Sequence, residues 1–277
     1  MSLRIQTNVE AFDAHRNLVN TSNQLASSME KLSSGYRINR AADDAAGLAI
    51  SEKLQSEIGG LDQAQRNAQD AVSLVQTAEG AMSEVTSMLQ RVRDLAVEFN
   101  NGTLSATDKA AVTAEVAQLC AEVARIGNDT SFNGIALLTG GASITFQVGA
   151  DDGQTINVNA IQLFGSGSGF AIDAAVFTFG TGSNGLVTLA SIDAAIQNVS
   201  NSRATFGSVQ NRLEHTLNNL ATYEENLTAS ESSIRDVDMA SEMVNFTKLQ
   251  ILQQAGTSML AQANQTPQSV LTLLRGG

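Results

Sequence analysis

The sequence has few of the residues on which catalytic and metal sites depend. Its 277 residues include one cysteine, two histidines and no tryptophan. One cysteine cannot form an internal disulfide, and one cysteine with two histidines cannot supply the usual set of zinc ligands. No His-Glu-x-x-His run occurs in the chain. We therefore expect no metal site, no cofactor and no enzymatic activity.

Proline and aromatic residues are also scarce. The only proline is Pro267, so no other proline interrupts a helix. Hydrophobic residues make up 43% of the chain but aromatic residues only 4%, so a core must be built from Ala, Val, Leu, Ile and Met. This composition is typical of long packed helices.

Basic residues are outnumbered, with 16 Lys and Arg against 28 Asp and Glu and a net charge of -12. Such a charge opposes binding to nucleic acid or to an anionic membrane surface. No window approaches the ~18 apolar residues of a membrane span, and the first residues contain no apolar signal core. If the protein leaves the cell, we expect a route that reads no cleavable signal.

Seven-residue repeats of apolar residues predict long helices on both sides of the chain. One repeat predicts a helix from about Asp44 to Phe99, and Ser105 with Asp108 predicts a capping box that opens a shorter helix ending at Gly127 and Asn128. Another repeat predicts a helix from about Ser191 to beyond Ile234. The repeats are Leu54, Leu61, Ala68, Val75, Met82, Leu89 and Ala96, and Ile192, Val199, Phe206, Leu213, Leu220, Leu227 and Ile234. The fold class we predict is mainly α, an antiparallel coiled-coil bundle built from both chain ends.

The middle of the chain has a different composition from its flanks. Eleven of the 22 glycines fall between Gly134 and Gly185, and no Lys or Arg occurs between Arg125 and Arg203. Alternation of apolar and polar residues over 144–158 predicts a small β-hairpin, in which Asp151-Asp152-Gly153 form a turn rather than a calcium loop. A third strand is expected at 176–179 and a further turn at 183–185.

The two chain ends carry apolar stripes with no third helix in the chain to cover them. Leaving several large aliphatic side chains exposed, at ~1.5 to 3 kcal/mol each, sacrifices on the order of ten kcal/mol. We therefore expect the ends to be largely disordered alone and to become ordered helices when other copies cover them. The predicted contact residues are Ile5, Phe12, Val19, Leu25, Leu32, Val244, Phe246, Ile251, Leu252, Met259, Leu260, Leu271 and Leu274.

Five segments closely resemble bacterial flagellin: 33–54, 89–103, 131–138, 233–243 and 251–275. The resemblance covers about 1–150 and 190–277, and it implies a secreted, extracellular filament protein with three layers. The expected parts are an inner terminal-helix domain of 1–33 and 237–277, a linker of 34–44, a three-helix domain of 45–138 and 190–236, and a short outer segment of 139–189. Tyr36 and Arg40 depart from the commonest residues of such linkers.

The resemblance also implies partners. Gln90, Arg91, Leu95 and Glu115 match positions that the flagellin-sensing Toll-like receptor binds in many family members, whereas Glu98 and Leu119 depart from that pattern. An export chaperone on the C-terminal helix, a cap protein and hook-junction proteins are further expected partners. Export through the flagellar type III channel and glycans on outer Ser or Thr residues are implied in the same way.

Two other functions compete with a swimming filament. A hook-filament junction protein shares the terminal helices but forms a short closed layer, and the match of 251–275 and of 89–103 favours the filament. A flagellin carrying a protease in its outer segment is disfavoured because that segment contains no histidine or cysteine. Cys120 lies beside an apolar stripe and is expected to act as a small buried hydrophobe.

Overall fold

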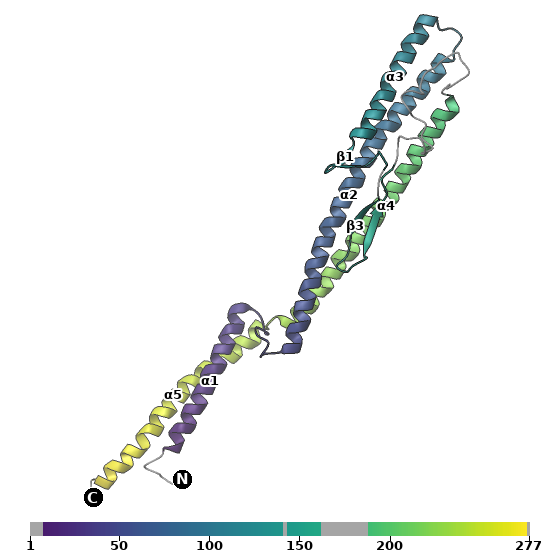
Figure 1. Ribbon diagram of the computed structural model, residues 1–277. Coiled ribbons are helices and arrows are strands. Elements are labelled where there is room, and N and C mark those ends of the chain that lie inside the picture. Colours follow the sequence, from purple (N-terminus) through teal and green to yellow (C-terminus); the bar gives the residue numbers. More distant parts are fainter. Residues whose placement is uncertain (1–7, 141–142, 162–187, 276–277) are drawn as a thin grey trace. The chain divides into compact units, whose positions relative to one another are not determined.

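The computed structural model describes residues 8–140, 143–161 and 188–275, and for 267–275 it describes the helix without the side chains. Within these residues the helices are α1 (Val9–Ser34), α2 (Ala45–Phe99), α3 (Ala106–Asp129), α4 (Leu189–Arg235) and α5 (Met239–Arg275) (Figure 1). The strands are β1 (Ser131–Phe132), β2 (Ile135–Ala136), β3 (Ile144–Gln147) and β4 (Thr155–Val158). The mainly helical fold class is confirmed.

The chain folds into two compact units, Met1–Ser56 with Asn226–Gly277 and Glu57–Glu225, and the division falls within α2 and α4. The domain limits expected from the sequence describe layers of an assembled filament rather than compact units of one chain, and they stay a prediction. None of the helices in the described residues has a stretch long and apolar enough to cross a bilayer.

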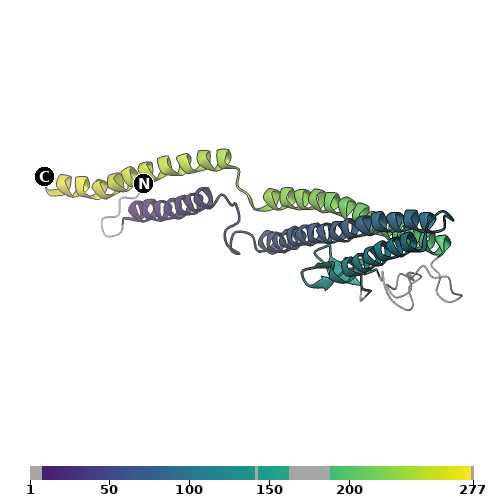
Figure 2. The ribbon, with the colours of Figure 1, turned by 90° about the horizontal axis from the view of Figure 1, so that it is seen from above.

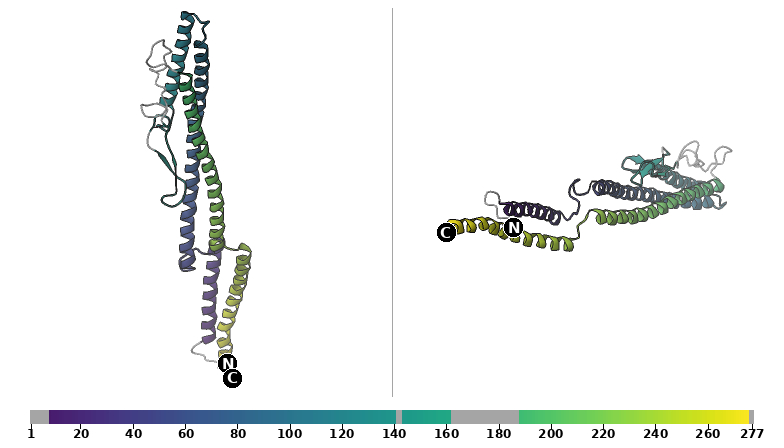
Figure 3. Two further views of the ribbon diagram at one scale, coloured as in Figure 1. Left: turned by 90° about the vertical axis from the view of Figure 1, so that its right-hand side faces the viewer. Right: turned by 90° about the horizontal axis from the view of Figure 1, so that it is seen from below.

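The unit Glu57–Glu225 is a bundle in which α2, α3 and α4 lie side by side (Figures 1 and 3). The predicted heptad seam of α2 forms the core from Leu61 to Ala96, where its residues are at most 1% exposed, whereas Leu54 at the start of the repeat is half-buried. These residues are Leu61, Ala64, Ala68, Ala71, Val75, Ala78, Met82, Val85, Leu89, Val92 and Ala96. The α4 repeat faces the same core, with Ile192, Val199, Phe206 and Leu213 all buried. The many alanines allow the helix axes to approach closely.

Helix α3 begins at the predicted capping box. The Ser105 hydroxyl accepts a hydrogen bond from the Asp108 backbone N–H at 3.2 Å, and the Asp108 carboxylate accepts one from the Ser105 N–H at 3.1 Å. The predicted end at Gly127 and Asn128 is early, since the helix runs to Asp129. Gly127 is buried in the bundle, and its helical backbone continues until Thr130 caps the carbonyl of Ile126.

The predicted hairpin over 144–158 is confirmed as the antiparallel pair β3 and β4, with Phe146 opposite Ile156. Ile156 and Val158 are buried against the bundle core. A second, shorter hairpin joins β1 to β2 through Asn133 and Gly134, which both have positive φ. The strand expected at 176–179 and the turn expected at 183–185 lie outside the described residues.

Candidate assembly surface on the terminal helix pair

In the unit formed by Met1–Ser56 and Asn226–Gly277, α1 and α5 lie side by side and antiparallel (Figures 1 and 2). At one end the Asn8 side-chain amide donates a hydrogen bond to the carbonyl of Ala263 at 2.8 Å. At the other end the buried Ser28 hydroxyl donates one to the carboxylate of Glu242. These contacts show which turn of α1 meets which turn of α5.

The inner side of the pair holds one of the two seven-residue repeats of α1. Leu18, Leu25 and Leu32 are half-buried, and Leu18 packs over Gly256. On α5, Leu249 is buried and Phe246 and Leu260 are half-buried. Leu25, Leu32, Phe246 and Leu260, which the sequence assigned to contacts between copies, are therefore partly covered within one subunit.

Six of the other predicted contact residues lie on the sides of α1 and α5 that are turned away from the partner helix. Phe12 is 70% exposed, Val244 72%, Ile251 61% and Met259 64%, and Val19 and Leu252 are also exposed. Ile5 lies outside the described residues, and Leu271 and Leu274 belong to α5 but to its part without described side chains. We call the six exposed residues Phe12, Val19, Val244, Ile251, Leu252 and Met259 the outer stripe.

Helical geometry explains the division into an inner and an outer side. Successive residues of a helix are rotated by about 100°, so Val19 points about 100° away from Leu18, and Ile251 points about 160° away from Leu249. Two apolar sides on one helix cannot both face the same partner helix. The part of the outer stripe on α5 lies in an almost uncharged segment, because Lys248 is the only Asp, Glu, Lys or Arg between Glu242 and Arg275.

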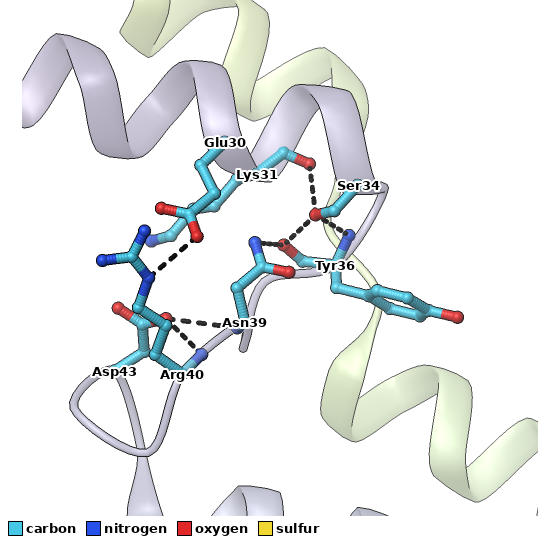
Figure 4. Close-up of polar contacts among 7 residues, drawn as sticks. All are labelled: Glu30, Lys31, Ser34, Tyr36, Asn39, Arg40 and Asp43. Atoms are coloured by element: carbon cyan, nitrogen blue, oxygen red, sulfur yellow. Dashed lines mark hydrogen bonds and ion pairs between the residues drawn. The ribbon is translucent and has the colours of Figure 1, made fainter.

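The linker from Gly35 to Asp44 is held by local polar contacts (Figure 4). Gly35 ends α1 with a φ of 78°, and its N–H donates to the carbonyl of Lys31. The backbone N–H groups of Arg40 and Asn39 donate to the Asp43 carboxylate at 3.0 and 3.1 Å and hold the pKa of that carboxyl below its usual value. The linker thus forms an ordered turn.

The two linker residues that depart from the flagellin pattern both have partners. The Arg40 guanidinium donates to the Glu30 carboxylate at 2.9 Å, which ties the linker back to α1. The Arg235 guanidinium lies over the Tyr36 ring, 4.4 Å from its centroid. Sequence reasoning missed both contacts, since no spacing rule relates Tyr36 to Arg235.

The candidate receptor residues lie on α2 and α3 of the other unit. Gln90, Arg91 and Glu115 are exposed, and Arg91 forms an ion pair with Glu115 at 2.8 Å that raises the pKa of Arg91. Leu95, in contrast, is 2% exposed and belongs to the bundle core. Its side chain offers no surface to a receptor, so the candidate patch is reduced to the three polar residues.

Groups that could hold a metal ion do not occur among the described residues. The thiol of Cys120 is buried in the bundle, and this burial raises its pKa to about 11. Such a thiol is protonated and unreactive at neutral pH. The prediction that Cys120 is a small buried hydrophobe agrees with this environment.

A bundle of long helices and a terminal helix pair with exposed apolar side chains are typical of a structural protein. Comparison with protein families narrows the class. Residues 5–143 match the bacterial flagellin N-terminal helical region, and residues 189–274 match the bacterial flagellin C-terminal helical region. The chain belongs to the bacterial flagellin family.

Individual flagellins align with this chain over nearly its full length. The chain is 51% identical to a flagellin of Halalkalibacterium halodurans, covering 98% of this chain and 99% of the relative. It is 45% identical to a flagellin of Bacillus subtilis, covering 99% of this chain and all of the relative. The protein is therefore a structural subunit that polymerises into the flagellar filament of a swimming bacterium.

A solved structure shares the fold alone. It is titled a putative flagellar hook-associated protein from Vibrio parahaemolyticus, with 17% identity, a TM-score of 0.59, and coverage of 70% of this chain and all of that one. Because this likeness is one of fold, it does not favour the hook-junction alternative. The full-length flagellin matches favour the filament subunit.

Proposed function

We propose that the outer stripe of α1 and α5 is the surface through which one subunit contacts the next in the filament. The exposure of four large apolar side chains on two adjacent helices carries this proposal: Phe12, Val244, Ile251 and Met259 are each at least 61% exposed. Covering such side chains releases ~1.5 to 3 kcal/mol each when burial is complete. We also propose that the helix pair becomes fully ordered only when neighbours cover it.

The arrangement of the stripe suits an open polymer. Its members on α1 differ from those on α5, so the surfaces that meet between copies can differ on the two partners. A head-to-tail interface of this kind produces a helix when the rotation does not close, which is the geometry of a filament. In this proposal, burial of the outer stripe supplies the free energy of assembly, because the apolar residues of the bundle core are already buried within one subunit.

Two substitutions at one position test this proposal. Ile251→Asp should block seeded elongation, because a carboxylate in a water-excluded contact costs several kcal/mol unless it is paired or protonated. Ile251→Leu keeps the apolar surface and should elongate seeds normally. Electron microscopy and sedimentation measure elongation, and circular dichroism checks that both subunits keep the bundle. Normal elongation by the Ile251→Asp subunit at neutral pH would contradict the proposal.

The finer parts of the biology belong to the same proposal. We infer that the subunit is exported through the flagellar type III channel and that a chaperone holds α5 before assembly. We also infer that cap and hook-junction proteins lie at the ends of the growing filament. The exposed apolar residues of α5, such as Val244 and Ile251, support a need for a chaperone, because they would otherwise associate early. In this scheme the subunit performs no catalysis of its own.

Recognition by the flagellin-sensing Toll-like receptor is proposed through Gln90, Arg91 and Glu115. Their exposure on neighbouring faces of α2 and α3, and the ion pair that joins Arg91 to Glu115, support a polar contact surface. A receptor that binds here would read charge and shape rather than an apolar anchor, because Leu95 is buried.

A further inference from the structure

The side chain of Arg235, at the end of α4, contacts three different segments of its unit. Its guanidinium lies 4.4 Å from the centroid of the Tyr36 ring in the linker. One of its nitrogens lies 3.4 Å from the side-chain oxygen of Gln55 on α2 and 3.9 Å from the carboxylate of Glu231 on α4. The Arg235 side chain is only 20% exposed, so solvent screens these contacts less than it screens a free surface ion pair.

The backbone beside Tyr36 and Arg235 is joined as well. Tyr36 and Asp236 form an antiparallel bridge. The Arg37 N–H donates to the carbonyl of Arg235 at 2.7 Å, and the Val237 N–H donates to the carbonyl of Gly35 at 2.9 Å. The segment that follows α1 and the segment that precedes α5 are therefore held together at the end of the helix pair where α1 ends and α5 begins.

The apolar repeat of α1 does not by itself select one register of α1 against α5. Leu18, Leu25 and Leu32 repeat every seven residues, so a slide of α1 along α5 by one heptad would bring one leucine to the place of another. The same slide would move Phe12 and Val19 by about 10 Å relative to Val244, at 1.5 Å per residue. When Leu25 takes the place of Leu18, Val19 takes that of Phe12 and Ala26 takes that of Val19. The inner contacts would survive in part, whereas the outer stripe would lose its large aromatic side chain from that place.

We propose that Tyr36 and Arg235 are positioning residues that set the register of α1 against α5 and so arrange the outer stripe for assembly. The backbone bridge joins the segments, and the stacked ring and guanidinium select one pairing of them, since only position 36 offers an aromatic ring in the linker. The effect on assembly rests on the proposed function of the outer stripe, but the effect on register does not.

Disulfide trapping in the free subunit measures the register directly. A Cβ built on Gly256 lies 3.9 Å from the Cβ of Leu18, within the range that a disulfide requires. The reporter is therefore a subunit with Cys120→Ser, Leu18→Cys and Gly256→Cys. A second reporter replaces Leu18→Cys by Leu25→Cys, which meets position 256 only after a slide of one heptad.

The test compares Tyr36→Leu with Tyr36→Phe in both reporters. A cation-π contact at a partly exposed site corresponds to about a two- to fivefold change in the ratio of two populations. Tyr36→Leu should raise the ratio of the 25–256 oxidation rate to the 18–256 oxidation rate by that factor. Tyr36→Phe keeps the ring and should match the reporter with Tyr36. Equal rates for Tyr36→Leu and Tyr36→Phe, or no 18–256 disulfide with Tyr36 in place, would overturn the proposal.

Seeded elongation separates this inference from the proposed function. The Tyr36→Leu subunit should elongate seeds several-fold more slowly than the Tyr36→Phe subunit at equal concentration. If the trapped register changes while elongation does not, the role of Tyr36 and Arg235 in assembly is refuted. If Ile251→Asp elongates normally, the outer stripe fails as the assembly surface, while the trapping rates still decide whether Tyr36 and Arg235 set the register.

Discussion

Gly60 of α2 touches the turn between β3 and β4: a Cβ added to Gly60 would lie 2.9 Å from the Cβ of Ala150 and 3.3 Å from its Cα. Ala150 is held in a tight turn, in which the Val148 N–H donates to the carbonyl of Gln154 at 2.9 Å. Because backbone rather than a flexible side chain faces Gly60, the turn cannot easily move aside. The absence of a side chain at Gly60 lets the hairpin lie against the bundle.

The neighbouring glycine provides a matched test of this contact. A Cβ added to Gly59 meets nothing within 4 Å. Gly59→Ala should stabilise the bundle by about 0.5–1 kcal/mol, because alanine loses less backbone entropy in a helix. Gly60→Ala gains the same helix propensity but crowds Ala150, and overpacking costs about 1–3 kcal/mol. Chemical denaturation followed by circular dichroism measures both, and equal stabilisation by the two changes would contradict the close approach.

Burial of Cys120 predicts a specific dependence of stability on pH. Its pKa in the folded protein is raised to about 11, above the ordinary thiol value. The folded state therefore disfavours the thiolate, and the stability that Cys120 contributes is fully present below the ordinary thiol pKa and is lost as pH rises through about 11.

The measurement for Cys120 is a difference between two proteins. Between pH 8 and pH 11 the melting temperature should fall more steeply for the parent chain than for Cys120→Ala, because the other groups titrate equally in both proteins. At pH 7.5 the folded thiol should react with iodoacetamide far more slowly than the thiol of the urea-unfolded chain. Rapid alkylation of the folded protein would show that Cys120 is accessible.

The helices could be predicted because apolar residues recur with a helical period. The expected start near Asp44 lies one residue before α2 begins, the expected end at Phe99 is where α2 ends, and the repeat from Ile192 predicted α4 with a similar margin. The hairpin β1–β2 was missed although Asn133-Gly134 is a typical signal for a two-residue turn. Its strands have only two residues each, too few for an alternating pattern to emerge.

The site was predicted less completely than the fold. Periodicity identified apolar positions on both terminal helices, but it could not tell which of them a partner helix within the subunit would cover. Leu25 and Phe12 belong to equally regular repeats, yet Leu25 is half-buried and Phe12 is 70% exposed. The contact between Tyr36 and Arg235 joins residues far apart in the chain, and no local pattern encodes such a pairing.

The receptor hypothesis now requires a different substitution from the one that the sequence suggests. Leu95→Ala removes a side chain that is 2% exposed, and a deletion of this kind in a packed core costs about 2–5 kcal/mol. A lower receptor response to Leu95→Ala would therefore follow from a loosened bundle as well as from a lost contact. Thermal melting should show this destabilisation directly.

Arg91→Glu is the sharper test, because Arg91 is exposed and its ion pair with Glu115 is screened by solvent. The substitution places like charges at that pair and should lower receptor activation by the soluble subunit without unfolding the bundle. Arg66→Glu is a matched control on the same helix, since Arg66 is also exposed and also forms an ion pair, with Asp62 at 2.7 Å. A reporter-cell assay for the receptor compares the two at equal concentration. Equal responses to Arg91→Glu and Arg66→Glu would remove Arg91 from the proposed contact, because the two changes alter charge equally and differ only in position.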